Sequence, residues 1–192
     1  YAQRYFQSRF GRRAEIAYNV DSFGHNAMLP QILRLSGMRG YVMMRPNGRE
    51  EKRYPFDGYA FLWESPDGSR IPAFRIPESY GSSPFERVAE KARADLERAE
   101  RLGTPIQCFY GVGNHGGGPT VENLRALLPL TAEHPESFAF SSPNAYFDEL
   151  DEGRLPVLRD DLLHHASGCY TAVMEVKRLN RLAESRLLAA EK

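Results

Sequence analysis

The chain has 192 residues, of which 42% are hydrophobic, 11% aromatic and 26% charged, and its formal net charge is +0. A chain of this length can bury a sizeable core and forms one domain, or one domain and part of a second. Basic and acidic residues are interleaved, which argues against nucleic acid as a partner. No apolar run reaches the roughly 18 residues that a bilayer span needs, so we expect no membrane partner.

The chain begins with Tyr1, not Met, inside an amphipathic helix that Gly11 ends. We therefore expect further sequence upstream, where a targeting signal could also lie. The two cysteines, Cys108 and Cys169, are far apart and lack a CxxC spacing. This usage favours a reducing, cytoplasmic location over a disulfide scaffold.

Strands and helices alternate through the first part of the chain. Residues 15–20 are β-branched and aromatic, which predicts a buried strand, and Asp21 follows its carboxyl end. Residues 26–35 carry apolar side chains at the spacing of one helix face, and residues 41–44 form the next predicted strand.

A hairpin is predicted next. Residues 58–63 and 70–76 flank a Pro-Asp-Gly turn signal, and Pro72 places the second arm at a sheet edge. A long helix follows from about Pro84 and ends at Gly103.

The next segments continue the alternation. Residues 106–110 predict a strand, and Thr120 is expected to cap a helix after the glycine-rich loop. Residues 138–140 predict a brief strand, and residues 143–150 a short helix. From about Tyr170 the chain reads as a single helix. The alternation indicates an α/β fold with a parallel sheet, followed by a helical domain.

Three segments lie where ligands of parallel α/β sheets bind, beyond the carboxyl ends of strands. They are residues 21–26, 111–120 and 160–165. An aspartate such as Asp21 fits either a turn or cap, or a catalytic carboxylate. Five glycines let residues 111–120 approach a ligand closely, but the loop lacks the Lys-Ser/Thr ending of a phosphate-binding P-loop.

Adjacent histidines and a strand-end arginine extend the candidate chemistry. His164 and His165 diverge in a strand or a helix, so they do not easily share one metal ion. One of them could bind a cation, with Asp160 or Asp161 holding its other ring nitrogen, and solvated or core histidines fit equally well. Arg45 could bind substrate hydroxyls or form an ordinary surface ion pair. These residues alone indicate a metal hydrolase with an α/β core.

Three sequence blocks carry a family resemblance. They are NVDSFGH at residues 19–25 with MLPQIL at 28–33, YGVGNHGGGPT at 110–120, and HHASGCYT at 164–171 leading into KRLNR at 177–181. Together they resemble glycoside hydrolase family 38 over nearly the whole chain. The last block is similar to the junction between that family's catalytic domain and its three-helix middle domain.

The resemblance implies a partial (β/α) barrel-like catalytic domain, retaining hydrolysis of α-mannosides and one zinc ion. Asp21 would be nucleophile and zinc ligand, forming a covalent mannosyl ester while a second carboxyl group acts as acid and base. His164 matches the family's later histidine ligand, with His165 as the alternative if the register shifts by one. Arg45 matches an arginine that lines the sugar pocket. The zinc ion would bind and orient the sugar's hydroxyls.

Two departures from the family pattern matter. The family's first two zinc ligands form a His-x-Asp pair, and no such pair precedes Asp21 here, so this piece alone should bind zinc poorly and be inactive. Asn114 stands where relatives usually have the acid/base aspartate, and an amide cannot donate and recover a proton. His115 is adjacent and titratable, which makes it a second candidate for the acid role.

The expected domain division follows from the same resemblance. Residues 1–157 would be the C-terminal part of the α/β catalytic domain, and residues 158–192 the start of the helical middle domain. An alternative function is a carbohydrate-binding pseudoenzyme that lost its acid/base at Asn114. A sugar deacetylase on a similar barrel is disfavoured because the Asp21 segment matches a glycosidase nucleophile. The expected partner is an α-mannoside oligosaccharide or glycoside. The chain could also form a homo-oligomer.

Overall fold

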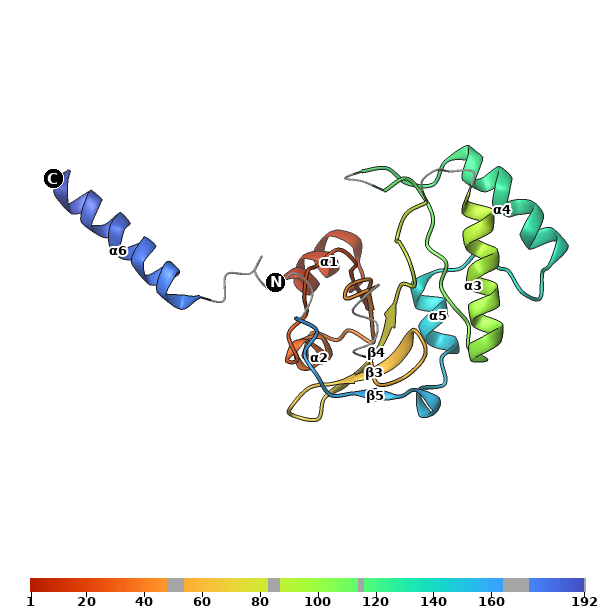
Figure 1. Ribbon diagram of the computed structural model, residues 1–192, viewed down its shortest axis with the longest axis horizontal. Helices are drawn as coiled ribbons and strands as arrows, with labels where there is room; N and C mark the ends of the chain where they lie inside the picture. The colour runs from red at the N-terminus through yellow and green to blue at the C-terminus, as the bar shows by residue number, and fades with distance from the viewer. Residues whose placement is uncertain (48–53, 83–86, 114–115, 164–172, 192) are drawn as a thin grey trace.

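The computed structural model describes residues 1–47, 54–82, 87–113, 116–163 and 173–191. Within these ranges no helix has the length and apolar character to cross a membrane. Figure 1 shows the arrangement of the elements, which follow one another along the chain as α1 (Ala2–Phe10), β1 (Ile16–Asn19), α2 (Leu29–Leu35), β2 (Gly40–Met43), β3 (Ala60–Glu64), β4 (Arg70–Arg75), α3 (Val88–Leu102), α4 (Val121–Glu133), α5 (Pro143–Glu149), η3 (Glu152–Arg154), β5 (Val157–Leu158) and α6 (Met174–Ala190).

The strands form one mixed sheet in the order β1-β2-β4-β3-β5. β1, β2 and β4 are parallel neighbours, so their carboxyl ends lie at the same edge of the sheet. β3 pairs antiparallel with β4, as the predicted hairpin requires, and β5 runs parallel to β3. The predicted α/β class is confirmed, with the hairpin making the sheet mixed.

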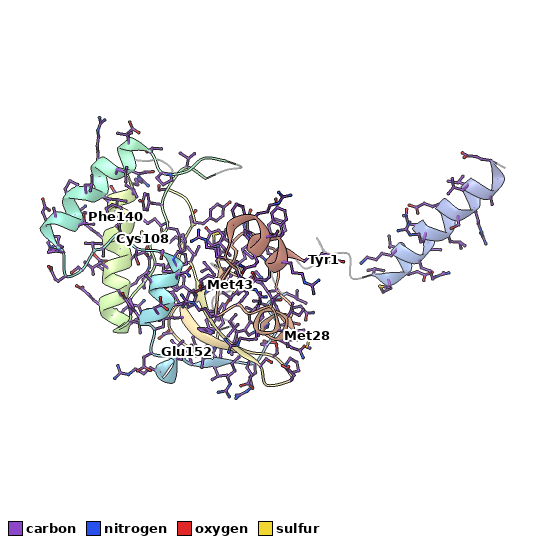
Figure 2. The ribbon with its side chains drawn as sticks, turned by 180° about the vertical axis from the view of Figure 1, so that it is seen from behind. Tyr1, Met28, Met43, Cys108, Phe140 and Glu152 are labelled. Carbon is purple, nitrogen blue, oxygen red and sulfur yellow. The ribbon has the colours of Figure 1, made fainter. Side chains whose placement is uncertain are left out.

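Side chains of the central strands alternate between two buried layers, because successive residues of a strand point to opposite faces. Tyr41 and Met43 pack with Trp63 on one face, where α2 contributes Leu29 and Leu33. The other face is covered by α5, and its core holds the buried side chains Val42, Met44, Ala60, Phe74, Ile76, Tyr146 and Phe147. Figure 2 shows Met43 in the interior, whereas Tyr1 and Met28 lie at the surface.

A third core joins α3 to α4, which lie side by side in Figure 1. Val88 and Ala92 of α3 contact Leu127 and Leu130 of α4. α3 ends at Gly103, whose φ of 64° is the left-handed conformation that glycine adopts at helix ends, as the sequence predicted. α4 begins at Thr120, as predicted, with a complete capping box.

Two predicted strands are wrong. Residues 106–110 and 138–140 form no strand among the described residues, and side chains satisfy part of the first segment's backbone. The Lys91 ammonium donates to the carbonyl of Phe109, and the Tyr146 hydroxyl donates to that of Pro105 at 3.2 Å. Packing onto the α3–α4 core has replaced strand pairing here.

The predicted edge position of Pro72 is also wrong, since β4 lies between β2 and β3. β2 pairs with β4 only from Ala73 onward, whereas Pro72 is opposite Leu62 of β3. The proline therefore comes just before the first residue of β4 that pairs with β2. A missing N–H at that position costs no hydrogen bond to β2.

Candidate functional site

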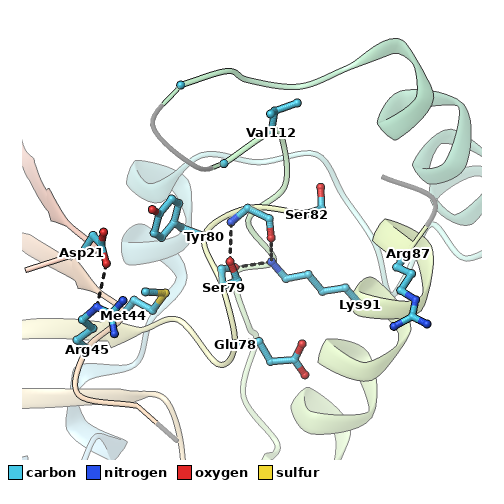
Figure 3. A pocket seen from close by; sticks show the side chains of 13 residues that line it. Asp21, Met44, Arg45, Glu78, Ser79, Tyr80, Ser82, Arg87, Lys91 and Val112 are labelled. Carbon is cyan, nitrogen blue, oxygen red and sulfur yellow. Dashed lines mark hydrogen bonds and ion pairs between the residues drawn. The ribbon is translucent and has the colours of Figure 1, made fainter. Parts of the chain in front are cut away.

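A cleft of about 740 Å³ opens at the edge where β1, β2 and β4 end. Asp21 lies just beyond β1, Arg45 just beyond β2, and the segment from Glu78 to Ser82 beyond β4 (Figure 3). The described part of the glycine-rich loop also lines the cleft and packs against the Glu78–Ser82 segment, where Gly113 lies next to Gly81. The lining residues are Asp21, Met44, Arg45, Glu78, Ser79, Tyr80, Gly81, Ser82, Arg87, Lys91, Val112, Gly113 and Gly116.

The two candidate residues at the first strand ends form an ion pair. Arg45 Nε donates to Asp21 Oδ1 at 2.8 Å, and the Asp21 side chain is 51% exposed. The Arg45 guanidinium carbon also lies 5.2 Å from the centre of the Phe23 ring, within cation–π range. The arginine thus fixes the orientation of a carboxylate that faces the cleft.

His25 lies behind this pair and is 2% exposed. Its Nε2 is 3.0 Å from the carbonyl oxygen of Arg45, which can only accept, so Nε2 carries the proton. The Tyr41 hydroxyl then donates to Nδ1 at 2.7 Å. Both nitrogens of a neutral imidazole are satisfied, and burial lowers the pKa of His25 to about 4. His25 therefore supports the backbone of Arg45.

The lowered pKa of His25 predicts a pH-dependent stability. An unfolded histidine binds a proton below about pH 6.5, whereas folded His25 stays neutral down to about pH 4. The free energy of unfolding should therefore be highest above pH 6.5 and fall by roughly 3 kcal/mol as pH drops to 4. Urea unfolding of the chain, followed by the fluorescence of its single Trp, Trp63, measures this slope.

Matched variants separate His25 from the other titrating groups. His25→Gln keeps an amide donor for the carbonyl of Arg45 but cannot titrate, so its slope between pH 4 and 6.5 should be the smaller. His134→Gln removes an exposed histidine and should leave the slope unchanged. Equal slopes in the wild type and His25→Gln would contradict the account.

The glycine-rich loop is closed at its base. The Val112 N–H donates to the carbonyl of Gly118 at 2.9 Å, and a Cβ at Gly117 would lie 2.5 Å from that of Val112. Backbone at Val112, Gly113 and Gly116 reaches the cleft, as the glycine content predicted. Asn114 and His115, the predicted acid/base position and its neighbour, lie outside the described residues.

The third predicted segment is brought next to the nucleophile segment. Backbone N–H and C=O groups of His25 and Leu162 exchange hydrogen bonds of 3.0 and 2.8 Å, forming a β-bridge. Trp63 Nε1 donates to the carbonyl of Asp160 at 3.0 Å. His164 and His165, the candidate zinc ligands, lie outside the described residues. The described chain just before them therefore runs alongside the Asp21 segment.

Sequence reasoning missed the wall formed by Glu78, Ser79, Tyr80 and Ser82. These residues could have been found from their position in the fold. They follow β4, which runs parallel to β1 and β2, the strands that precede Asp21 and Arg45. Lys91 of α3 holds this wall in place by donating to the carbonyls of Ser79, Gly81 and Phe109. All three ammonium protons are used, and burial lowers the pKa of Lys91.

The fold and the cleft define an α/β protein with an oriented carboxylate at the strand ends. Residues 1–168 match the family model described as the glycosyl hydrolases family 38 N-terminal domain. The chain belongs to this family.

Individual relatives agree with the family match. The chain is 30% identical to alpha-mannosidase G of Dictyostelium discoideum over 199 residues and 27% identical to an alpha-mannosidase of Saccharomyces cerevisiae over 202 residues. These alignments cover 100% and 97% of this chain but only 18% of either relative. A crystal structure of an alpha-mannosidase from Enterococcus faecalis V583 matches the fold with a TM-score of 0.61 and 21% identity, covering 81% of this chain and 19% of that one.

Proposed function

We propose that the complete protein hydrolyses α-mannosidic bonds with retention, through a mannosyl ester on Asp21. The observation that carries the proposal is the Asp21–Arg45 pair in the cleft at the strand ends of a family 38 chain. The relatives that the chain matches are named alpha-mannosidases, which supports an α-mannoside as substrate.

The proposed reaction assigns distinct tasks to Asp21 and Arg45. The Asp21 carboxylate attacks the anomeric carbon, the bond from that carbon to the glycosidic oxygen breaks, and a proton donor neutralises the leaving oxygen. Water then attacks the same carbon and releases Asp21 and mannose. Arg45 Nε lies 2.8 Å from Asp21 Oδ1. This contact orients the carboxylate before the reaction, so that less entropy is lost on attack.

The proposed zinc site draws only partly on described residues. Asp21 offers a carboxylate, but both ring nitrogens of His25 are engaged in hydrogen bonds. The described ranges hold no group of three or more His, Cys, Asp or Glu side chains that could bind a metal. We therefore propose Asp21, His164 (or His165) and an upstream His-x-Asp pair as the ligands. Zinc bound there would supply Lewis-acid contacts to sugar hydroxyls.

The product of the complete reading frame, incubated with an aryl α-mannoside, tests the proposal. Proton NMR should detect α-mannose as the first product, because two displacements at one carbon retain its configuration. Removing metal with a chelator should abolish turnover, and added zinc should restore it. First-formed β-mannose would contradict the mannosyl ester, and zinc-independent turnover would contradict the metal site.

A carbohydrate-binding protein without turnover is the second candidate function. Asn114 favours it, since an amide in the acid/base position cannot transfer a proton. Folded, zinc-loaded protein that binds a mannoside without hydrolysing it would establish this alternative.

We also propose a separate helical domain, which begins shortly after residue 157, and a cytoplasmic location. A separate helical part is supported by α6, which buries none of its residues. β5 and the contacts of Asp160 and Leu162 with the sheet domain favour placing the boundary after Leu162. The location is supported by the two widely separated cysteines, Cys108 and Cys169, which lack a CxxC spacing.

A further inference from the structure

A buried polar pair lies beneath the glycine-rich wall of the cleft. Ser82 is 5% exposed and Asn123 is 0% exposed, and they come from the segment after β4 and the first turn of α4. Asn123 Nδ2 donates to Ser82 Oγ at 3.4 Å. Polar side chains buried to this degree persist only when hydrogen bonds offset the loss of water.

Ser82 joins its own segment to the start of the loop through Gly111. The Ser82 N–H donates to the carbonyl of Gly111 at 2.8 Å, and the Gly111 N–H donates to Ser82 Oγ at 3.1 Å. Ser82 Oγ donates to the Gly111 carbonyl at 3.4 Å. With the contact from Asn123, the hydroxyl makes one donated and two accepted hydrogen bonds, which is its full capacity.

Asn123 holds the other end of the same loop. Its Oδ1 accepts from the Thr120 N–H at 3.2 Å, while its own N–H donates to Thr120 Oγ1 at 3.1 Å. The Asn123 side chain therefore links Thr120, where the loop ends, to Ser82, which binds Gly111, where the loop begins.

At the base of the loop, where this pair binds, the backbone is too tightly packed to adopt another conformation. A Cβ at Gly111 would lie 2.9 Å from the carbonyl carbon of Gly118, and the φ of Gly111 is 125°. One Å of misplacement in a catalytic wall can cost up to about a hundredfold in rate. A clamp at both ends of the loop is therefore a device for keeping the wall in register with Asp21.

We propose that Ser82 and Asn123 act as one positioning unit that holds the glycine-rich loop at the cleft wall. The inference rests on the proposed hydrolase function for its kinetic consequence, but the clamp itself is a property of the described backbone. Neither side chain is assigned a role on the substrate; both act through the loop.

The test compares Ser82→Ala, Asn123→Ala and the double variant in the complete protein. Leu130→Val is the matched control, because it also weakens α4 but removes only a core methylene that faces α3. Hydrogen exchange of the Gly111 and Val112 amides and kcat/KM on an aryl α-mannoside are measured where all variants are folded.

We expect faster amide exchange and a kcat/KM lower by about tenfold to a hundredfold in either single variant. The double variant should be no worse than the more damaging single one, since the two residues act as a unit. Leu130→Val should change neither quantity.

The two readouts keep the clamp and the proposed function distinguishable. Multiplicative losses in the double variant, or unchanged exchange in the single ones, would overturn the clamp while wild-type turnover stands. Accelerated exchange with no wild-type turnover would overturn the hydrolase and leave the clamp standing.

Discussion

Replacing Asp21 by Asn should lower the turnover of an aryl α-mannoside by about ten-thousandfold in the complete protein, as expected when a nucleophile of a concerted site is lost. The amide is nearly isosteric with the carboxylate and keeps an oxygen for the Arg45 guanidinium, so the ion pair becomes a neutral hydrogen bond. An amide is a poor nucleophile and forms no mannosyl ester. The loss should therefore appear in kcat, with little effect on folding.

Asp148→Asn is the control for this variant. The Asp148 side chain is 65% exposed and pairs with Arg39, an ion pair worth at most about 1 kcal/mol. It should therefore retain full activity. An Asp21→Asn variant that keeps more than about a tenth of wild-type kcat would contradict Asp21 as nucleophile.

Chemical rescue gives a sharper reading of the same role. Asp21→Ala leaves space at the carboxylate position for azide, which can attack the anomeric carbon from the face opposite the leaving group. The carbon–nitrogen bond forms as the bond to an activated aryloxide breaks, so the product is β-mannosyl azide. Detection of that anomer by NMR places Asp21 on the attacking face; an α-azide product would contradict it.

The positions of Asp21 and Arg45 could be predicted because they depend only on local sequence and on the alignment of parallel strands. Asp21 and Arg45 each follow a short apolar run, and parallel strands align their carboxyl ends. Their 2.8 Å contact is the direct result. The Thr120 cap was equally accessible, since its partner Asn123 lies within the same turn.

Features that depend on distant partners could not be predicted. The pattern of residues 106–110 favours a strand, but Lys91 binds the Phe109 carbonyl and the segment packs on α3 and α4. A lysine on an amphipathic helix ordinarily indicates a solvated face, so nothing local marks Lys91 as a partly buried side chain that binds three carbonyls. The burial of His25 depends on its bridge to Leu162, from the far end of the chain.

Converting Asn114 to Asp should raise kcat/KM on mannosides with poor leaving groups by about a hundredfold, the lower end of what general acid catalysis contributes. The reason is chemical: a carboxylic acid can protonate the departing oxygen and then accept a proton from water, whereas the amide can do neither. The substrates are a phenyl mannoside and a dinitrophenyl mannoside, assayed with the same enzyme preparations.

The ratio of kcat/KM for the phenyl and dinitrophenyl mannosides separates protonation of the leaving group from other effects of the substitution. A dinitrophenolate departs without a proton, so its kcat/KM, which reports only the first displacement, should stay within about twofold in Asn114→Asp, while the kcat/KM of the phenyl substrate gains the full factor. Equal gains would indicate a general repair of the cleft and contradict a lost acid. If neither rate changes, the acid lies elsewhere, and His115→Ala should then slow the phenyl substrate alone. A gain confined to the phenyl substrate would show that the acid was lost at Asn114, whereas a protein that binds mannosides without turnover would hydrolyse neither substrate.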